Sequence, residues 1–435
     1  MKKFYFLLLG LCVGMLVSAA PVNPSRAQQI AQNFMQNRIG MKSHKMKRAM
    51  RLPLTSENTK GQAPFYVFNI SDNDGFVIVS GDDRAPSILG YSDTGSIDTD
   101  HLPANLQDLF TGYERQMEIL SGMEDVPYAQ KMKARAPKPT KHSIRPLVPS
   151  RWDQGLPYYN QTPMVNGEHT ATGCAATAMA QIMYFHKYPQ GPIQKSIPGY
   201  QSDAIHTTMP ELPITTFKWN EMSDTYASDA TADPCAVSEL MLYCGQALEM
   251  NYNLGSKGGS GALSRRFYPA FVEYFGYDAG LQLVSRSEYS YDDWNDLIYN
   301  ELANNRPVLY SGVTSLNGGH AFVCDGYASG EYFHINWGWH GRSDGYFLLS
   351  VLFPEIQGTG GSMGNGFGLD QEAVIGIQRP NGGTKPFIAL NIYEMSATSY
   401  TNTFTRTNSS ANFTGSAPCM RFYNRKGATA LNYEV

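Results

Sequence analysis

Apolar residues near the N-terminus fall into two short runs separated by turn residues, which is the pattern of a β-hairpin. The runs Pro64–Ile70 and Gly75–Gly81 are rich in β-branched and aromatic residues, and the turn Asp-Asn-Asp-Gly joins them. This turn lacks the later ligands of a calcium loop, so we interpret it as a hairpin turn alone. Apolar positions at helical spacing predict helices over Ser25–Arg38 and around Leu106–Leu120. Residues 23–122 are therefore predicted to form a separate module of sheet and helices.

The segment 317–339 predicts a second hairpin. Two glycines lead into His320, which opens an apolar strand, and a turn at 328–330 returns the chain through a second strand. Hairpin strands lie side by side, so we expect His320 to lie near Asn336 and Trp337 at the end of the return strand. Either residue could then orient or shield the imidazole ring.

Cys174 stands where a tight turn, Thr172-Gly173, runs into a pattern of small residues at helical spacing. A helix N-terminus carries partial positive charge and unpaired N–H groups, which favour the reactive thiolate. A cysteine among alanines can equally be an inert core residue. Gln154 lies upstream and could place its side-chain amide beside the backbone N–H of Cys174, around a developing oxyanion. The order Gln, Cys, His, Asn is that of papain-like proteases.

The composition and charge of the chain narrow its class. Its 435 residues suffice for two or three domains, and 12% aromatic residues with 41 glycines suit a loop-rich α+β protein. The formal net charge is −4 and no long basic run occurs, which argues against nucleic acid as a partner. The histidines are scattered without ligand spacing, so no metal or other cofactor is expected.

The first residues have the pattern of a signal peptide. Met1–Lys3 is charged, Phe4–Val17 is apolar and Ser18–Ala20 consists of small residues. We therefore expect a secreted protein. Later stretches lack the unbroken apolar length that a membrane span requires.

The cysteines do not predict a disulfide framework. Cys12 leaves with the signal peptide, and five cysteines, an odd number, remain. Cys235 and Cys244 share a predicted helix, and their spacing puts them too far apart for a bridge. We interpret both, and Cys324, as small core residues, which leaves Cys174 as the thiol with a chemically useful setting.

Several segments together resemble the streptopain-type cysteine peptidases, the papain-like family that includes interpain. The matching segments are 152–160, 171–189, 319–326, 334–345, the glycine-rich 358–366, and the leader, so the likeness covers roughly residues 25–380. It implies Cys174 as nucleophile, His320 as general base and acid, and Gln154 in the oxyanion hole. It also implies that Ser260 and Gly319 contact the substrate backbone. Whether Asn336 or Trp337 supports the histidine is left open.

The resemblance also implies an architecture. We expect an α+β chain with a signal peptide (1–20), an inhibitory propeptide with a basic linker (21–136), a papain-like catalytic domain (137–380) and a linker with a short β-rich segment (381–435). The propeptide would be an intramolecular inhibitor, with the loop His101–Asn105 as the candidate blocking segment and Asn105 near the site. The linker between Lys131 and Arg145 is basic and contains proline, so it is predicted to be exposed and cleaved during maturation.

The predicted activity is hydrolysis of protein or peptide substrates through a thioester on Cys174. The family likeness suggests an apolar residue before the one that is cleaved. Two alternatives remain open at this stage. One is another cysteine-dependent acyl-transfer enzyme, such as a cell-wall amidase or transferase. The other is a secreted adhesin on a peptidase-like scaffold.

Overall fold

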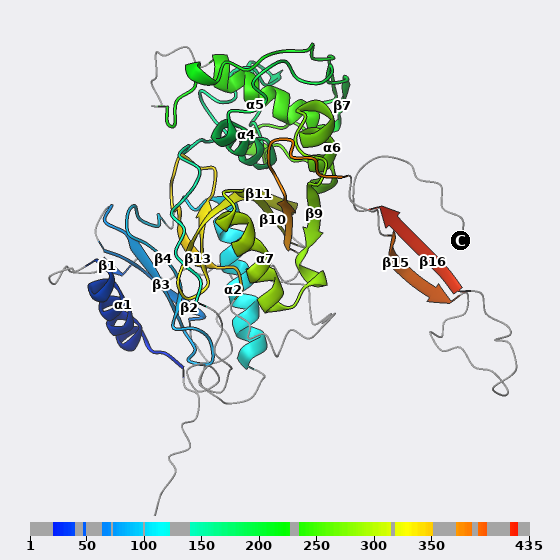
Figure 1. Ribbon diagram of the computed structural model, residues 1–435. Helices are drawn as coiled ribbons and strands as arrows, with labels where there is room; N and C mark the ends of the chain where they lie inside the picture. Colours follow the sequence, from blue (N-terminus) through cyan, green and yellow to red (C-terminus); the bar gives the residue numbers. More distant parts are fainter. Residues whose placement is uncertain are drawn as a thin grey trace, which may run out of the picture.

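The computed structural model describes eleven stretches of the chain, and the structural statements below concern these alone. They are 21–39, 47–48, 63–70, 73–98, 101–121, 140–226, 235–314, 318–350, 371–384, 390–397 and 418–424. Figure 1 shows their helices and strands. The predicted signal peptide (1–20), the greater part of the basic linker (131–139) and the glycine-rich segment (358–366) lie outside the described residues.

The N-terminal module consists of two helices and a small antiparallel sheet. Its elements are α1 (Pro24–Ile39), β1 (Lys47–Arg48), β2 (Phe65–Asn69), β3 (Phe76–Ser80), β4 (Ile88–Ser92) and α2 (Ala104–Ser121). The predicted hairpin is confirmed, with Phe65 paired to Ser80 and Asn69 to Phe76. Both predicted helices are present and extend one or two residues beyond the predicted ends.

The larger part of the chain contains a group of helices and the remaining strands of the main sheet. Its principal elements are α4 (Cys174–His186), α5 (Cys235–Ala247), α6 (Phe267–Pro269), β9 (Gln282–Ser285), α7 (Tyr291–Ala303), β10 (Val308–Thr314), β11 (Gly318–Ala328), β12 (Tyr332–Asn336), β13 (Gly345–Leu348) and β14 (Gln371–Ile375). Short pairs of strands occur at β5 (Met164–Val165) with β6 (Glu168–His169), and at β7 (Tyr200–Ser202) with β8 (Thr207–Met209). This confirms the predicted α+β class.

The two parts of the chain share one ten-stranded sheet, in the order β1-β2-β3-β4-β13-β12-β11-β10-β14-β9. The junction is the antiparallel pair β4–β13, where Gly90 lies opposite Phe347 and Tyr91 opposite Tyr346. A side chain at Gly90 would clash here, because its Cβ would lie 2.7 Å from a ring carbon of Phe347. The N-terminal module is therefore held by strand pairing, in the manner of β-augmentation.

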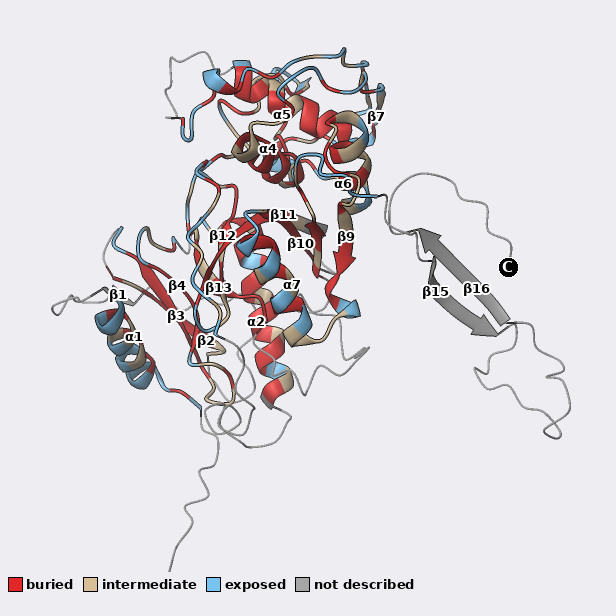
Figure 2. Cartoon of the chain, viewed as in Figure 1, coloured by how far each residue is buried: buried red, intermediate tan, exposed pale blue. Residues whose placement is uncertain are grey.

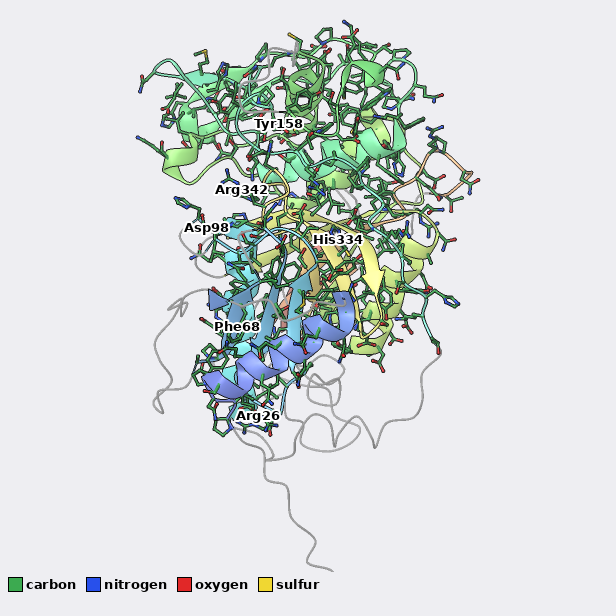
Figure 3. All side chains as sticks on the ribbon, turned by 90° about the vertical axis from the view of Figure 1, so that its left-hand side faces the viewer. Arg26, Phe68, Asp98, Tyr158, His334 and Arg342 are labelled. Atoms are coloured by element: carbon green, nitrogen blue, oxygen red, sulfur yellow. The ribbon has the colours of Figure 1, made fainter. Side chains whose placement is uncertain are left out.

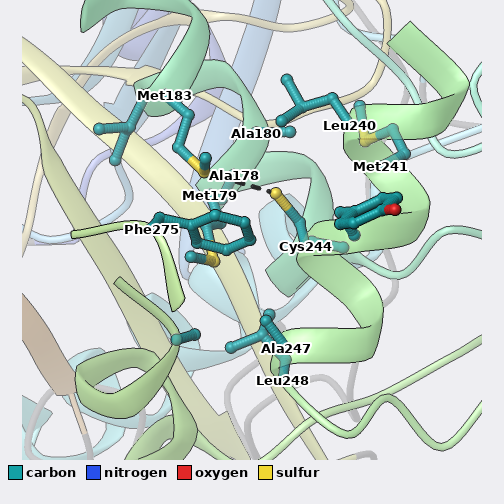
Figure 4. Close-up of a cluster of buried hydrophobic side chains, with 14 of the residues drawn as sticks. Ala178, Met179, Ala180, Met183, Leu240, Met241, Cys244, Ala247, Leu248 and Phe275 are labelled. Atoms are coloured by element: carbon teal, nitrogen blue, oxygen red, sulfur yellow. Dashed lines mark hydrogen bonds between the residues drawn. The ribbon is translucent and has the colours of Figure 1, made fainter. Parts of the chain in front are cut away.

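Two cores follow from this arrangement. Helices α4 and α5 pack together, and Figure 4 shows Cys244 of α5 against Met183 of α4, with the two sulfur atoms 3.6 Å apart. The second core lies under helix α2, where Phe110 of the N-terminal module packs in the same cluster as Phe322 and Trp337 of the larger part. Figure 2 shows α4 and the central strands buried. The N-terminal module thus shares one hydrophobic core with the larger part.

Two of the core assignments for cysteines are confirmed and one is wrong. Cys244 and Cys324 are buried, whereas Cys235 is exposed, because it is the first residue of α5. The thiols of Cys174, Cys235, Cys244 and Cys324 are free. Near the C-terminus, β15 (Leu390–Ala397) and β16 (Pro418–Asn424) form a two-stranded antiparallel sheet of their own. No helix of the described ranges is long and apolar enough to cross a membrane.

Candidate active site

Cys174 is the first residue of helix α4, and the glycine before it fixes this position. Gly173 has φ of 87°, a conformation that side chains disfavour, and a Cβ there would lie 2.8 Å from the Met250 side chain. The Cys174 thiol accepts a hydrogen bond from the backbone N–H of Ala321, at 3.4 Å. Burial raises the pKa of the thiol, and the N–H groups of Ala321 and of the helix start only partly offset this. In this form of the protein the raised pKa therefore disfavours the thiolate.

His320 lies on β11, directly before Ala321, and so reaches the same place as Cys174. Its Nε2 lies 3.4 Å from Oδ2 of Asp108, a residue of helix α2 in the N-terminal module. Burial lowers the pKa of His320. The imidazole is thus paired with the N-terminal module, while the Cys174 thiol is bonded to the main chain.

Asp108 is an unusual residue for this position. Its side chain is buried, and within the described residues Oδ2 has no hydrogen-bond partner of good geometry. Burial raises the pKa of Asp108 to about 7, with Arg115 opposing the shift. The distance to His320 is that of an ion pair, yet neither group shifts the other's pKa. Because both groups are shielded from water, the contact is that of a carboxyl group beside a neutral imidazole rather than a strong ion pair.

Asn105, on the same face of α2 one turn earlier, makes a second contact between the N-terminal module and the larger part of the chain. Its buried side-chain amide donates to the backbone carbonyl of Trp337, at 2.8 Å. Asn105 thus lies at the turn that begins at Trp337, whereas the side chain at the histidine is Asp108, and the blocking role of 101–105 stays a prediction. Helical spacing puts Asn105 and Asp108 on one face, three residues apart, but does not show which of them meets His320.

The residues predicted to orient His320 make their contacts elsewhere. β12 pairs Asn336 with Val323, so the return strand ends before it reaches a position opposite His320. The Asn336 amide instead bonds to Gln181 and to the carbonyl of Ser150. The Trp337 indole donates to the carbonyl of Ser343. These contacts leave an orienting role for Asn336 or Trp337 as a prediction.

Three further predicted site residues lie around Cys174. The carbonyl of Gln154 accepts the Thr172 N–H at 3.2 Å, which places this loop against the turn before Cys174. The Ser260 hydroxyl donates to the carbonyl of Ala171 and accepts the Asn253 N–H, so it joins its own loop to the segment just before Cys174. Gly319 pairs with Val313 in the sheet, one residue before His320.

A buried charged group supports the strand behind the site. His334 Nδ1 lies 2.6 Å from Oδ1 of Asp325, whose other oxygen accepts the Val148 N–H. Figure 3 places His334 near the middle of the molecule, between Tyr158 and Phe68. Burial lowers the pKa of His334, but the charge and hydrogen bond of Asp325 outweigh this and the net pKa is raised. Asp344 is half-buried, and its carboxyl group accepts the N–H of Trp337.

The described ranges contain no group of three His, Cys, Asp or Glu side chains that could hold a metal ion. The chemistry that this geometry offers is that of a thiol and an imidazole. A half-buried thiol at a helix start, a histidine on strand β11 and a second module against that histidine together define a thiol protease joined to its own inhibitor.

Comparison with known proteins agrees with this class. The model of the peptidase C10 family matches residues 152–347, and that of the Spi protease inhibitor family matches residues 19–117. The chain is 36% identical over 408 residues to streptopain of Streptococcus pyogenes, covering 87% of this chain and 99% of that protein. It therefore belongs to the peptidase C10 family, and it is a cysteine protease with an N-terminal propeptide inhibitor.

Two further relatives support the assignment. The thiol protease/hemagglutinin PrtT of Porphyromonas gingivalis is 35% identical over 393 residues, and this chain spans 44% of its length. A solved structure of Prevotella intermedia prointerpain A is similar with a TM-score of 0.63 and 28% sequence identity, covering 78% of this chain and all of the prointerpain fragment. The inhibitor module and the protease are thus also combined in a solved relative with the same arrangement.

Proposed function

We propose that this chain is the latent precursor of a secreted cysteine endopeptidase in which Cys174 is the nucleophile and His320 the general base and acid. The observation that carries this assignment is the hydrogen bond from Ala321 to the Cys174 thiol, which puts the start of α4 against the residue next to His320. A thiol at a helix start beside a histidine is the arrangement that nucleophilic catalysis needs.

The reaction follows from these groups. His320 takes the thiol proton, and the Cys174 sulfur forms a bond to the carbonyl carbon of the substrate peptide. The C–N bond then breaks as His320 returns the proton to the leaving amine. Water attacks the thioester with His320 as base, which releases the acid and restores the thiol. The Gln154 amide and the Cys174 N–H stabilise the oxyanion, by about 3 kcal/mol for each donor.

Latency follows from the position of Asp108. For catalysis His320 must leave the Asp108 carboxyl and engage the Cys174 thiol, whereas in the uncut chain helix α2 holds it at 3.4 Å from the Asp108 side chain. Cleavage in the segment 131–145 would free the module that carries α2. The part of this segment that is described supports such access, since Thr140, His142 and Arg145 are exposed. We accordingly assign 21–136 to the inhibitor and 137–380 to the peptidase.

The experiment that tests the function compares the full chain, Cys174→Ala and Cys235→Ala in reducing buffer with a casein-like protein. Chain mass and substrate cleavage are followed over time, with and without a thiol-reactive peptide inhibitor. Cys235 is the matched control, because it is an exposed cysteine on the neighbouring helix α5. We expect the full chain and Cys235→Ala to shorten and become active, and Cys174→Ala to remain intact and inert.

Other outcomes would overturn the proposal. Hydrolysis that survives Cys174→Ala would exclude this nucleophile. A folded chain that stays inactive on protein after its N-terminal module is removed, but acts on cell-wall amides, would favour the other acyl-transfer enzyme.

A further inference from the structure

The buried amide of Gln181 joins three segments that each carry a part of the site. Gln181 lies on α4, seven residues after Cys174, so two helical turns place both on about the same face. Its side chain is fully buried. The oxygen Oε1 accepts from the Ser150 hydroxyl at 3.1 Å and from the Trp152 N–H at 3.2 Å. These two contacts fix the segment that leads directly to Gln154.

The same amide also holds the turn after β12. Gln181 Oε1 accepts from Asn336 Nδ2 at 3.1 Å, and Gln181 Nε2 lies 3.2 Å from Asn336 Oδ1. Asn336 in turn donates to the Ser150 carbonyl at 2.7 Å and accepts the Gly338 N–H at 3.0 Å. The two amides therefore form a reciprocal pair between α4 and the turn that begins at Trp337.

Main-chain groups determine how both amides are oriented. The Trp152 and Gly338 N–H groups can only donate, and the Ser150 carbonyl can only accept. Turning over either amide would set a donor against a donor or an acceptor against an acceptor. A fully satisfied buried network of this kind has a single arrangement.

Gln154 is held on both sides of its loop. Gln181 fixes residue 152 through its backbone N–H, and the Thr172 N–H fixes the carbonyl of Gln154 itself. Both anchors belong to α4 or to the turn just before Cys174. The same helix that carries Cys174 therefore sets the position of the loop.

We propose that Gln181 is a positioning residue for the oxyanion hole, which sets the distance between the Gln154 amide and the Cys174 N–H without touching the substrate. The inference rests on the proposed function of Cys174 and Gln154. An oxyanion donor acts mainly in the transition state, so a displaced donor lowers kcat more than it alters KM. A shift of about 1 Å costs on the order of 10²-fold in rate.

The primary test replaces Gln181 by methionine, which has a similar length and no hydrogen-bonding amide. Each variant is made as the full chain, matured, and titrated at Cys174 so that rates refer to active enzyme. We expect Gln181→Met to lower kcat by roughly 10- to 100-fold with KM changed by less than about threefold. Binding of a peptide aldehyde, whose adduct with Cys174 places an oxygen in the oxyanion hole, should weaken by a similar factor.

The matched control is Gln246→Met. Gln246 is a buried glutamine on α5 in the same helical part, and its amide donates to the Pro198 and Pro210 carbonyls. Both of these hydrogen bonds run to segments other than the loop that carries Gln154. We expect this variant to lose stability comparably while kcat and aldehyde binding stay within about twofold of the unaltered enzyme. If Gln181→Met, Gln246→Met and the unaltered enzyme all had the same kcat, the proposed positioning role of Gln181 would be overturned.

A double-mutant cycle with Gln154→Ala gives the sharpest readout. If Gln181 acts through Gln154, then Gln181→Met adds little to Gln154→Ala, and the double variant is no more than about threefold slower than the single Gln154 variant. Fully multiplicative losses would show that Gln181 acts by another route and would overturn the proposal. If Cys174→Ala is active, the proposed function fails instead, whatever the behaviour of Gln181.

A conservative variant covers the case in which Gln181→Met does not fold. Gln181→Glu keeps the acceptor for Ser150, Trp152 and Asn336 but loses the donor to Asn336 Oδ1. We expect a smaller loss of kcat, roughly three- to tenfold, at unchanged KM. A kcat equal to that of the unaltered enzyme would count against the proposal.

Discussion

Oδ2 of Asp108 lies 3.4 Å from Nε2 of His320, and the two residues belong to different modules of the chain. The carboxyl group comes from helix α2 of the inhibitor, and the imidazole from strand β11 of the protease. The inhibitor therefore reaches the proposed catalytic base directly, and does more than cover the entrance to the site. Because the contact depends on the position of α2, any change that undocks this helix also releases His320.

Replacing Asp108 by alanine should weaken latency. The substitution removes the side chain that holds His320, a contact worth about 1 kcal/mol, which corresponds to roughly a fivefold change in an equilibrium. We expect the full-length Asp108→Ala chain to shorten roughly five times faster than the unaltered chain in reducing buffer. The measurement is the rate at which full-length mass disappears.

Glu118→Gln is the control for this variant, since Glu118 is an acidic residue on the exposed face of the same helix. It should process at the unaltered rate. If Asp108→Ala and Glu118→Gln process alike, the contact with His320 does not contribute to latency.

The stability of the uncut chain should depend on pH through the titration of Asp108. Burial raises the pKa of this carboxyl from 3.8 to about 7, so between these values the folded chain binds a proton that the unfolded chain has lost. Stability of the uncut chain due to Asp108 therefore falls as pH rises from about 4 to about 7, and is constant above that. Protonated Asp108 can also donate a hydrogen bond to the neutral imidazole of His320, and this bond too would stabilise the uncut chain at the lower pH.

This effect is measured in the Cys174→Ala chain, which cannot mature. Thermal unfolding across pH 4 to 8 is compared with that of Cys174→Ala/Asp108→Asn, whose residue 108 does not titrate. We expect the difference in stability between the two to shift in favour of the Asn variant as pH rises. A difference that is independent of pH would show that Asp108 titrates normally in the folded chain.

The features that the sequence predicted correctly are those encoded by neighbouring residues. The hairpin of β2 and β3 and the helix behind Cys174 follow from local turn residues and apolar spacing. The partners of Asn336 could not be predicted this way, because they depend on the register of β11 with β12 and on an irregularity between Cys324 and Gly326. The contact of Asp108 with His320 depends on how two modules pack, which no local pattern encodes.

The exposure of Cys235 illustrates the same limit. Its apolar neighbours favoured a core position, but as the first residue of α5 it lies at a helix end that faces solvent. Cys244, on the third turn of the same helix, is buried against α4. Helix periodicity predicted the element correctly, and tertiary packing decided which of its cysteines is buried.

Breaking the buried pair of Asp325 and His334 should destabilise the protease. Asp325→Asn removes the charge that keeps the pKa of His334 raised and weakens the bond to the Val148 N–H. We expect a loss of about 3 kcal/mol in the free energy of unfolding below pH 6, where His334 is charged. Since a raised histidine pKa stabilises the folded state at low pH, the loss should shrink as pH rises through the pKa of His334 in the folded protein.

The control for this prediction is Glu273→Gln, which breaks an exposed ion pair with Lys195. Exposed pairs contribute about 0 to 1 kcal/mol, so this variant should unfold almost as the unaltered chain does. Denaturant unfolding of the Cys174→Ala chain provides both values. Equal stabilities of the two variants would show that the buried pair is dispensable.

The carboxylate of Asp278 should hold residues 381–383 against the rest of the peptidase part. It accepts the N–H groups of Gly280, Asn381 and Gly383, at 2.8, 2.6 and 3.1 Å. Burial raises the pKa of Asp278, but these three bonds outweigh it and the net pKa is lowered. A Cβ at Gly383 would lie 1.8 Å from Oδ1 of Asp278, so this position tolerates only glycine.

Gly383→Ala should therefore release the segment 378–384 from Asp278. We expect cleavage within 378–384 by added subtilisin, a protease of broad specificity, to become several times faster, since proteases require a chain that can leave its hydrogen bonds. Mass spectrometry of the fragments measures it, with Gly191→Ala as control, because a Cβ at Gly191 meets no atom within 4 Å. Unchanged cleavage within 378–384 in Gly383→Ala would show that Asp278 does not hold this segment. Acid should act in the same direction as the substitution, because the stabilisation by a carboxylate of lowered pKa is lost as pH falls through that pKa.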